Sequence, residues 1–344
     1  MKKAAFPVLL LLLSQLLTAQ TLEWKAGMYH FFDNTEFLGS SYVNDQTMAG
    51  IRFSPEIGLG MNRNHHFRIG FDALKSYGSP NFVDSCSPTA YYLYDNGHFR
   101  FMMGSFAREG QLNDFSRAFF QDSIRYFRPN MNGFLLAYKD EGLHAKLFLD
   151  WTGKQSFTVH EAFFVGGSVS YQKSIFVAEA QAYMFHHAGS LSIRGVRDNI
   201  LMHPAIGLDL TGHTWLDSLR FSVGTLVGLE RERRNSDFFT SRKGWMIELD
   251  AAFKGFGLNA STYMGQGIMV DYATMGNKLY WGDPLYRGKF YSRIDLSYDF
   301  LRLPYLTGKV NFANHFSEGN FYVEQSLIIQ ATLGSNSKHF HGKK

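Results

Sequence analysis

The chain has 344 residues, of which 45% are hydrophobic, 16% aromatic and 19% charged, and its formal net charge is +4. This apolar content excludes a disordered chain, and the single cysteine, Cys86, excludes an intramolecular disulfide framework. Beyond the first twenty residues, no apolar run reaches the ~18 residues that a transmembrane helix needs. The near-neutral charge gives no support to nucleic-acid binding, so no nucleic-acid partner is expected.

The first residues have the pattern of a secretory signal peptide. Lysines follow Met1, an apolar stretch runs from Ala4 to Leu13, and the small residue Ala19 precedes the expected cleavage point. A transmembrane anchor is the alternative, but the stretch is short and Pro7 interrupts it. The mature chain is therefore expected to lie outside the cytoplasm.

After the leader, apolar and polar residues alternate with a period of two, as in β-strands that have one apolar face. In residues 143–151, for example, Leu143, Ala145 and Leu147 alternate with His144 and Lys146. The pattern predicts about sixteen strands, within a range of about 14–18. In chain order they cover residues 22–32, 47–61, 65–76, 88–95, 98–107, 131–138, 143–151, 159–171, 175–186, 199–211, 219–229, 243–254, 256–265, 289–300, 306–314 and 320–333.

The connections between these strands alternate between short turns and longer polar loops. The longer ones are residues 33–46, 77–87, 108–130, 152–158, 187–198, 230–242, 266–288 and 315–319. A transmembrane barrel has such an alternation, and only a closed sheet satisfies the backbone of strands in lipid. The predicted fold is all-β, a transmembrane antiparallel up-and-down β-barrel. The alternative is a secreted all-β protein with an aqueous surface.

Three segments follow from these patterns. We predict a signal peptide over residues 1–19, an outer-membrane β-barrel over 20–334 and a polar C-terminal tail over 335–344. Outer-membrane lipid is the expected partner, in a Gram-negative bacterium. A homo-oligomer or a complex with a secretion or assembly machine is also possible.

The leader, the alternating strands and the position of one long loop resemble the general porins of Gram-negative outer membranes. The resemblance is architectural and covers the whole mature chain. One departure is the polar stretch from Ser335 to Lys344, because such barrels commonly end in an aromatic residue. The resemblance implies a channel for passive or weakly selective diffusion of small hydrophilic solutes.

The strand charges are expected to face the barrel lumen, because each would cost roughly 2–4 kcal/mol against hydrocarbon. The predicted pore-lining residues are Lys25, Arg52, Glu56, Arg68, Asp72, Arg100, Lys146, Asp150, Glu179, Asp209, Arg220, Glu248, Asp250, Arg293, Asp295, Lys309 and Glu324. Positive and negative groups nearly balance, which argues against strong ion selectivity. The alternative is a network of ion pairs that closes the lumen.

The segment from Arg108 to Pro129 occupies the position of the porin loop that narrows the pore. Its aromatic spacing predicts an apolar stripe on a short helix, capped by Asn113 or Asp114. We predict that it constricts or plugs the barrel, through Asp114, Phe115, Arg117, Phe119, Asp122, Arg125 and Arg128. A helical lid outside the barrel is the alternative.

No catalytic motif is recognisable, so the sequence does not predict an enzyme, a metal site or a cofactor. A lipid hydrolase in a barrel would need a histidine that an acid orients at the lipid boundary. His203 with Asp209, and His144 with Asp150, lie too far apart along their strands. Besides a diffusion channel, a closed accessory barrel, a barrel hydrolase or acyltransferase, and a transporter of hydrophobic solutes remain as alternatives.

Overall fold

The computed structural model describes residues 21–335. The predicted signal peptide and nearly all of the predicted polar tail lie outside the described residues. Sixteen strands form one closed antiparallel barrel, in which each strand pairs with its sequence neighbours and β1 pairs with β16. The predicted fold class and strand number are therefore confirmed.

The strands have the following bounds: β1 Thr21–Glu36, β2 Gln46–Gly60, β3 His65–Ser76, β4 Ser85–Asp95, β5 Phe99–Ala107, β6 Asn130–Asp140, β7 Leu143–Gly153, β8 Ala162–Lys173, β9 Phe176–His187, β10 Arg197–Asp209, β11 Ser218–Glu232, β12 Thr240–Phe253, β13 Phe256–Gly265, β14 Phe290–Leu303, β15 Leu306–Ser317 and β16 Asn320–Gly334. The helical segments are short: α2 Ser123–Phe127, α3 Tyr272–Met275, and the 3-10 turns η1 Gly276–Lys278 and η2 Pro284–Arg287. Among the described residues, no helix is long and apolar enough to cross a membrane.

The strands differ from the predictions mainly at their ends. β3 and β13 begin and end where the alternation does, whereas β11 continues to Glu232 and β15 to Ser317. Backbone pairing does not require apolar side chains, so a ladder can extend beyond the apolar part of its strand. The alternation therefore locates the strands but not their ends.

One face of every strand forms the outer surface of the barrel, and this surface is apolar. Ile206 is 71% exposed, Trp245 61% and Leu296 52%. In a water-soluble protein such a continuous apolar surface would promote aggregation, whereas in an outer-membrane barrel it contacts lipid. Not every aromatic residue of the strands belongs to it: Phe31 of β1 is fully buried inside the barrel, where its ring stacks on Tyr126 at 4.4 Å.

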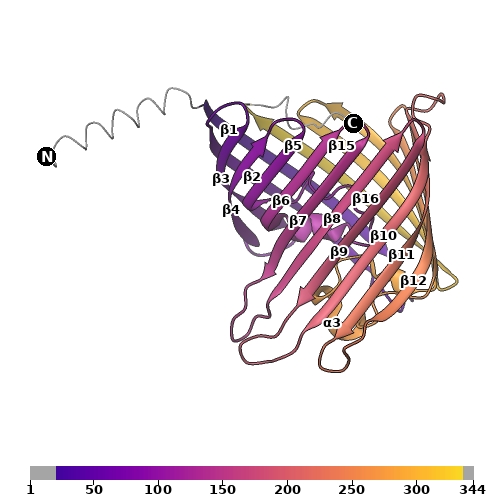
Figure 1. The fold of residues 1–344 in the computed structure, drawn as a ribbon. Coiled ribbons are helices and arrows are strands. Elements are labelled where there is room, and N and C mark those ends of the chain that lie inside the picture. Colours follow the sequence, from indigo (N-terminus) through magenta and orange to yellow (C-terminus); the bar gives the residue numbers. More distant parts are fainter. Residues whose placement is uncertain (1–20, 336–344) are drawn as a thin grey trace.

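The two ends of the barrel differ (Figure 1). Most connections at the end where β1 begins and β16 ends are short turns, and most at the opposite end are longer loops. In barrels of this kind the short turns face the periplasm and the longer loops face outward. We call these the turn end and the loop end.

Two long loops, residues 108–129 and 266–289, fold back into the barrel. Phe115 and Phe119 of the first loop contact the wall at Phe148 of β7 and Tyr183 of β9, with ring centroids 5.7 and 5.2 Å apart. The two loops also contact each other, because the amide of Gln121 donates to the carbonyl of Trp281 at 2.8 Å. Together with inward-facing wall residues they form one buried apolar cluster inside the barrel.

The predicted helix in the first loop is wrong over most of its length. Only α2 is helical, and residues 108–122 form successive turns. Asp114 does not cap a helix, since its carboxylate pairs with Lys146 of β7 at 2.5 Å. The aromatic rings are anchored at separate points along the wall, and a turn conformation follows the curved wall where a straight helix would leave it.

Candidate functional site

Most of the predicted pore-lining charges are paired with another charge of the wall or with an inward loop. The pairs are Arg52 with Asp72, Asp150 with Arg108, Lys146 with Asp114, Glu179 with Arg220, Lys309 with Asp299, and Arg293 with both Asp295 and Glu324. Several are deeply buried, for example Asp72 at 4% exposure. A charge held in such a pair lies away from bulk water.

Each of the other predicted pore-lining residues has a polar or charged neighbour of its own. Glu56 accepts from Tyr91 at 2.9 Å, Arg68 pairs with Glu23 at 2.9 Å, Arg100 pairs with Asp95 at 2.6 Å, Asp209 accepts from the amide of Thr211 at 3.0 Å, Glu248 lies 3.4 Å from Ser222, Asp250 accepts from Asn259, and Lys25 lies opposite Glu56 in the β1–β2 register. They are spread along the barrel and do not converge on one point.

The residues predicted for the constriction loop contact the barrel wall and the second inward loop. Asp114 binds Lys146 and Ser168, Phe115 and Phe119 enter the apolar cluster, Arg117 and Asp122 reach β14, the carbonyl of Arg125 accepts from Arg52, and Arg128 lies over the ring of Trp281 at 5.4 Å. Of these predicted residues, Arg117 and Asp122 line a cavity together with charged residues of the wall.

This cavity lies just inside the loop end and holds about 100 Å³. Its walls come from the ends of β1, β2, β14, β15 and β16, from the loop between β1 and β2, and from both inward loops. Its charged and polar lining includes Asp33, Arg117, Asp122, Ser123, Asp283, Arg293, His315 and Glu324. Such a concave site with converging polar groups is the default candidate for catalysis.

Hydrogen bonding fixes the tautomer of His315 in this cavity. The hydroxyl of Tyr291 lies 2.8 Å from Asp283 Oδ2 and 2.9 Å from His315 Nδ1. A carboxylate only accepts, so the single hydroxyl proton of Tyr291 goes to Asp283 and Nδ1 of His315 must donate to Tyr291. In neutral His315, the proton-free nitrogen is therefore Nε2, which has no hydrogen-bond partner among the described residues.

Acidic side chains share the cavity with Nε2. Glu324 places its Oε2 3.3 Å from Nε2. Asp33 also lines the cavity, and its Oδ1 has no partner among the described residues, although Oδ2 accepts from Tyr126 at 2.9 Å. Free acceptors in a buried polar cavity are positions where water or substrate would bind.

Two guanidinium groups supply positive charge to the same cavity. Arg293 lies 3.2 Å from Asp122 Oδ2, and Arg117 donates to Asp122 at 2.9 Å. Burial alone would raise the pKa of Asp122, but Arg117, Arg293 and Arg125 outweigh burial and hold the pKa of Asp122 well below its ordinary value. Asp122 is therefore ionised, and it fixes both guanidinium groups at the cavity wall.

Sequence reasoning missed His315, Tyr291, Asp283 and Asp33. The alternation places His315 in the connection 315–319 and Asp283 in the longer loop 266–288, and it assigns neither residue to a site. Asp283 and Tyr291 are 8 residues apart, and Tyr291 and His315 are 24 residues apart. No local motif joins them, because barrel pairing of β14 with β15 brings the side chains together.

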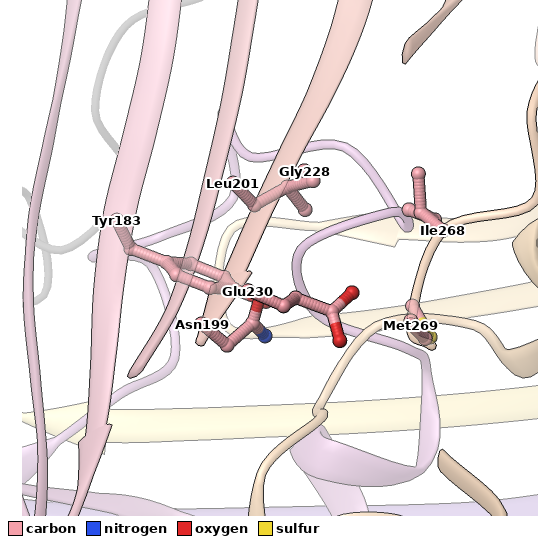
Figure 2. Close-up of a pocket in the computed structure, with 7 residues that line it drawn as sticks. All are labelled: Tyr183, Asn199, Leu201, Gly228, Glu230, Ile268 and Met269. Carbon is pink, nitrogen blue, oxygen red and sulfur yellow. The ribbon is translucent and has the colours of Figure 1, made fainter. Parts of the chain in front are cut away.

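A second recess lies between β9, β10, β11 and the loop 266–289 (Figure 2). Its one carboxylate, Glu230, accepts from the hydroxyl of Tyr280 and from the amide of Val270 at 3.0 Å. Asn199 donates to the carbonyl of Leu279 at 3.1 Å. These polar groups anchor the loop to the wall, so the recess has a structural role.

Residues 21–335 contain no group of three or more histidine, cysteine or acidic side chains that could hold a metal ion.

The fold places this protein in the class of outer-membrane β-barrels. OmpT of Vibrio cholerae lacking loop L8 matches with a TM-score of 0.56 and 9% identity, over 92% of this chain and 100% of that one. OccK2 (OpdF) of Pseudomonas aeruginosa matches with 0.51 and 11%, over 91% and 98%, and OpdK of the same organism with 0.50 and 11%, over 91% and 99%. At these identities the likeness shows the fold alone. Contact with membrane lipid follows from it.

Sequence comparison identifies the family. The model of the lipid A 3'-O-deacylase-type family matches residues 15–333, so the chain belongs to that family. No curated protein matches the chain in sequence.

This membership corrects two expectations from the sequence. The prediction of a porin-like diffusion channel is wrong, and so are its non-enzymatic alternatives, because the family is an enzyme family. The expectation that the chain is not an enzyme is wrong for the same reason. The physical reason is visible in the barrel: the two inward loops fill it with an apolar cluster. A balance of positive and negative strand charges is compatible with a water-filled lumen and also with a lumen closed by ion pairs. The sequence alone does not distinguish these two interiors.

Proposed function

We propose that this protein is an outer-membrane esterase that removes an ester-linked acyl chain from lipid A, as the family description implies, and that the cavity around His315 is its active site. The observation that carries the proposal is the fixed tautomer of His315, which leaves Nε2 free inside a polar cavity. A base oriented by a second group is the arrangement that hydrolases use to activate a nucleophile.

In the proposed reaction, Nε2 of His315 accepts a proton from water while the water oxygen attacks the ester carbonyl carbon. Glu324, 3.3 Å away, stabilises the resulting imidazolium. Arg117 and Arg293 supply positive charge for the oxygen that becomes negative in the tetrahedral intermediate. When the ester bond breaks, His315 returns the proton to the leaving sugar oxygen. The products are a free fatty acid and a sugar hydroxyl.

The barrel rim is low next to this cavity. β15 and β16 are joined by the two residues Glu318 and Gly319, whereas the other connections at the loop end are longer. Outside this turn, Phe316 and Phe321 face lipid and pack against each other at 5.1 Å. A lipid of the outer leaflet would therefore have to move out of the membrane by a smaller distance here than elsewhere around the rim to bring its ester bond to the cavity.

The test is acyl release from purified lipid A by the protein in detergent micelles, followed by mass spectrometry of the lipid and the free fatty acid. His315→Gln should lower the rate by at least about 100-fold, the range expected for loss of a general base. Wild-type protein that releases no fatty acid from lipid A would refute the proposed function.

His203→Gln is the matched control. His203 of β10 is also a fully buried histidine without hydrogen-bond partners among residues 21–335, and it does not line the cavity. It should retain activity close to wild type. An equal loss in both variants would show that any change to a buried histidine disturbs the barrel, and would remove His315 from the active site.

Two further features belong to the same proposal. We infer that residues 1–19 direct export and are cleaved, leaving a barrel domain over 20–334 and a polar tail over 335–344. N-terminal sequencing of protein from outer membranes should begin at Gln20. A homo-oligomer or a secretion or assembly partner stays a prediction, and cross-linking in intact membranes tests it.

A further inference from the structure

A row of polar and aromatic side chains crosses five strands on the lipid-facing surface at the loop end. We call it the interface row, and it consists of Trp151, Phe163, His186, Asp198 and Arg231. Each residue lies directly opposite the next in the strand register: Trp151 with Phe163, Phe163 with His186, His186 with Asp198, and Asp198 with Arg231. Residues paired in this way share one face of a sheet, and this face points to lipid.

The next outward row toward the membrane centre is entirely apolar. It consists of Leu149, Val165, Met184, Ile200 and Leu229, which are paired in the same order across the same strands. The change from an apolar row to a charged one marks the boundary between acyl chains and headgroups. The interface row therefore lies at headgroup height.

Asp198 is the centre of the interface row. It is 1% exposed, and it binds three cationic or polar side chains: Nδ1 of His186 at 2.8 Å, Arg231 at 3.0 Å and Arg233 at 2.8 Å. A carboxylate on the lipid-facing surface gains no favourable contact from lipid acyl chains. It does hold two guanidinium groups in place, and their side chains are 21% and 49% exposed.

Positive charge at this position exceeds what Asp198 neutralises. Arg234 lies next to Gly195, with Nε 3.3 Å from where a Cβ would be, and it forms no ion pair within the described part of the chain. On the other side of Asp198, Trp151 stacks on Phe163 at 4.9 Å and Phe163 packs on His186 at 4.8 Å. Fixed arginines beside an aromatic platform match a phosphate group attached to a sugar ring.

We propose that the interface row, with Arg233, is a binding site for a phosphorylated glycolipid of the outer leaflet. The guanidinium groups bind its phosphate, the Trp151–Phe163 pair contacts its sugar, and the apolar row below contacts its acyl chains. The site is separate from the cavity around His315. The proposal of this binding site rests on the outer-membrane location of the protein and does not require that the protein hydrolyses lipid A.

A catalytic role for His186 is less consistent with these contacts. Its Nδ1 is oriented by Asp198, as in a hydrolase, but Arg231 and Arg233 share that carboxylate. Because three side chains share the Asp198 carboxylate, it is not reserved for orienting the imidazole of His186. The same cations favour binding of an anion.

The experiment measures lipid retention by native mass spectrometry. The protein carrying His315→Gln is placed in phosphatidylcholine nanodiscs that contain bisphosphorylated lipid A or a dephosphorylated lipid A. We expect bound bisphosphorylated lipid, and about ten-fold less of the dephosphorylated lipid, because charge-assisted hydrogen bonds to phosphate are lost. Equal retention of the two lipids would overturn the proposal.

The test variant is Arg231→Gln with Arg233→Gln and Asp198→Asn, which removes the arginines without leaving a buried unpaired carboxylate. Retention should fall about ten-fold. Arg302→Gln, at the turn end, is the control for charge and should retain lipid as before. Unchanged retention in the triple variant, or displacement of the lipid by inorganic phosphate, would contradict a glycolipid site.

Acyl release distinguishes this site from the proposed active site. In the His315-containing protein, the triple variant should still hydrolyse lipid A presented in micelles. Loss of all activity in His186→Gln alone, with His315→Gln fully active, would instead place catalysis at the interface row and refute its role as a separate binding site.

Discussion

Tyr291 illustrates how one hydroxyl group can determine the chemistry of a neighbour. Its proton goes to Asp283, and this obliges His315 to donate from Nδ1. Without the hydroxyl, Nδ1 loses its partner and either tautomer becomes accessible. The residue that positions the base thus lies outside the cavity lining, yet it decides which nitrogen faces the cavity.

Tyr291→Phe should therefore lower the rate of acyl release by about 10- to 100-fold, less than His315→Gln, because the imidazole remains but is poorly oriented. The KM for lipid A should change little, since Tyr291 lies outside the cavity. Tyr183→Phe is the control, because the hydroxyl of Tyr183 is also buried but lies in another part of the barrel and has no hydrogen-bond partner in the described structure. Equal rates in the two variants would contradict the positioning role.

Asp122 joins the first inward loop to β14, and its pairing predicts a pH dependence. Because Arg117, Arg293 and Arg125 keep the pKa of Asp122 below its value in the unfolded chain, about 3.9, this pairing stabilises the folded state above that pH. The contribution is lost as the pH falls through the lower, folded pKa. Neutral pH should therefore be well within the range of full stabilisation.

Asp122→Asn should lower the free energy of unfolding at pH 7 by about 1–3 kcal/mol, since charge-assisted hydrogen bonds are lost. The difference from wild type should shrink as the pH falls below 4. Urea unfolding at several pH values, followed by tryptophan fluorescence, measures it. Asp237→Asn, in an exposed loop, should match wild type throughout, and a pH-independent difference for Asp122→Asn would exclude the ionic explanation.

Among the elements, the two inward loops are held by apolar packing as well as by charge. Phe119 is fully buried against Tyr183, and Trp281 is 2% exposed and packs on Phe164 and Phe185. Short helices and turns of this kind have little stability of their own. The loops hold their conformation because they bury these rings against the barrel wall.

Trp281→Ala should destabilise the barrel by about 3–5 kcal/mol, the range for removal of a large buried aromatic side chain. Acyl release should fall as well, because Trp281 holds the loop that carries Asp283. Thermal unfolding in detergent measures the first effect. Phe238→Ala, at a position 83% exposed, is the control and should change neither property. A stable Trp281→Ala barrel would mean that the apolar cluster does not hold the loops.

For the whole molecule, the apolar cluster predicts a closed barrel. Wild-type protein in planar bilayers should give no stable current steps, because water and ions would have to cross a packed apolar layer. Deletion of residues 113–127 should produce steps that scale with salt concentration. Steady conductance of the wild-type protein would show that the loops leave an open passage. If the deletion variant also gives no current steps, residues other than 113–127 close the barrel.

The sequence determined those features of the molecule that depend on local periodicity. Lipid on one face and a protein interior on the other impose a period of two, so the alternation in segments such as 65–76 and 256–265 was sufficient to locate the strands, and the closed barrel followed from them. The inward position of Arg52 and Arg293 followed from the same rule, because charge is costly in hydrocarbon.

Only the tertiary structure decided what the interior does. Whether Arg52 faces water or pairs with Asp72 depends on a neighbouring strand, and whether residues 108–129 pack inside depends on distant rings such as Tyr183. His315, Tyr291 and Asp283 come together through strand pairing and a folded loop, at separations that no linear motif spans. The strands of a barrel follow from an alternation that any short segment of the sequence shows. A catalytic cavity is defined by contacts between distant residues, and these contacts exist only after the barrel has closed.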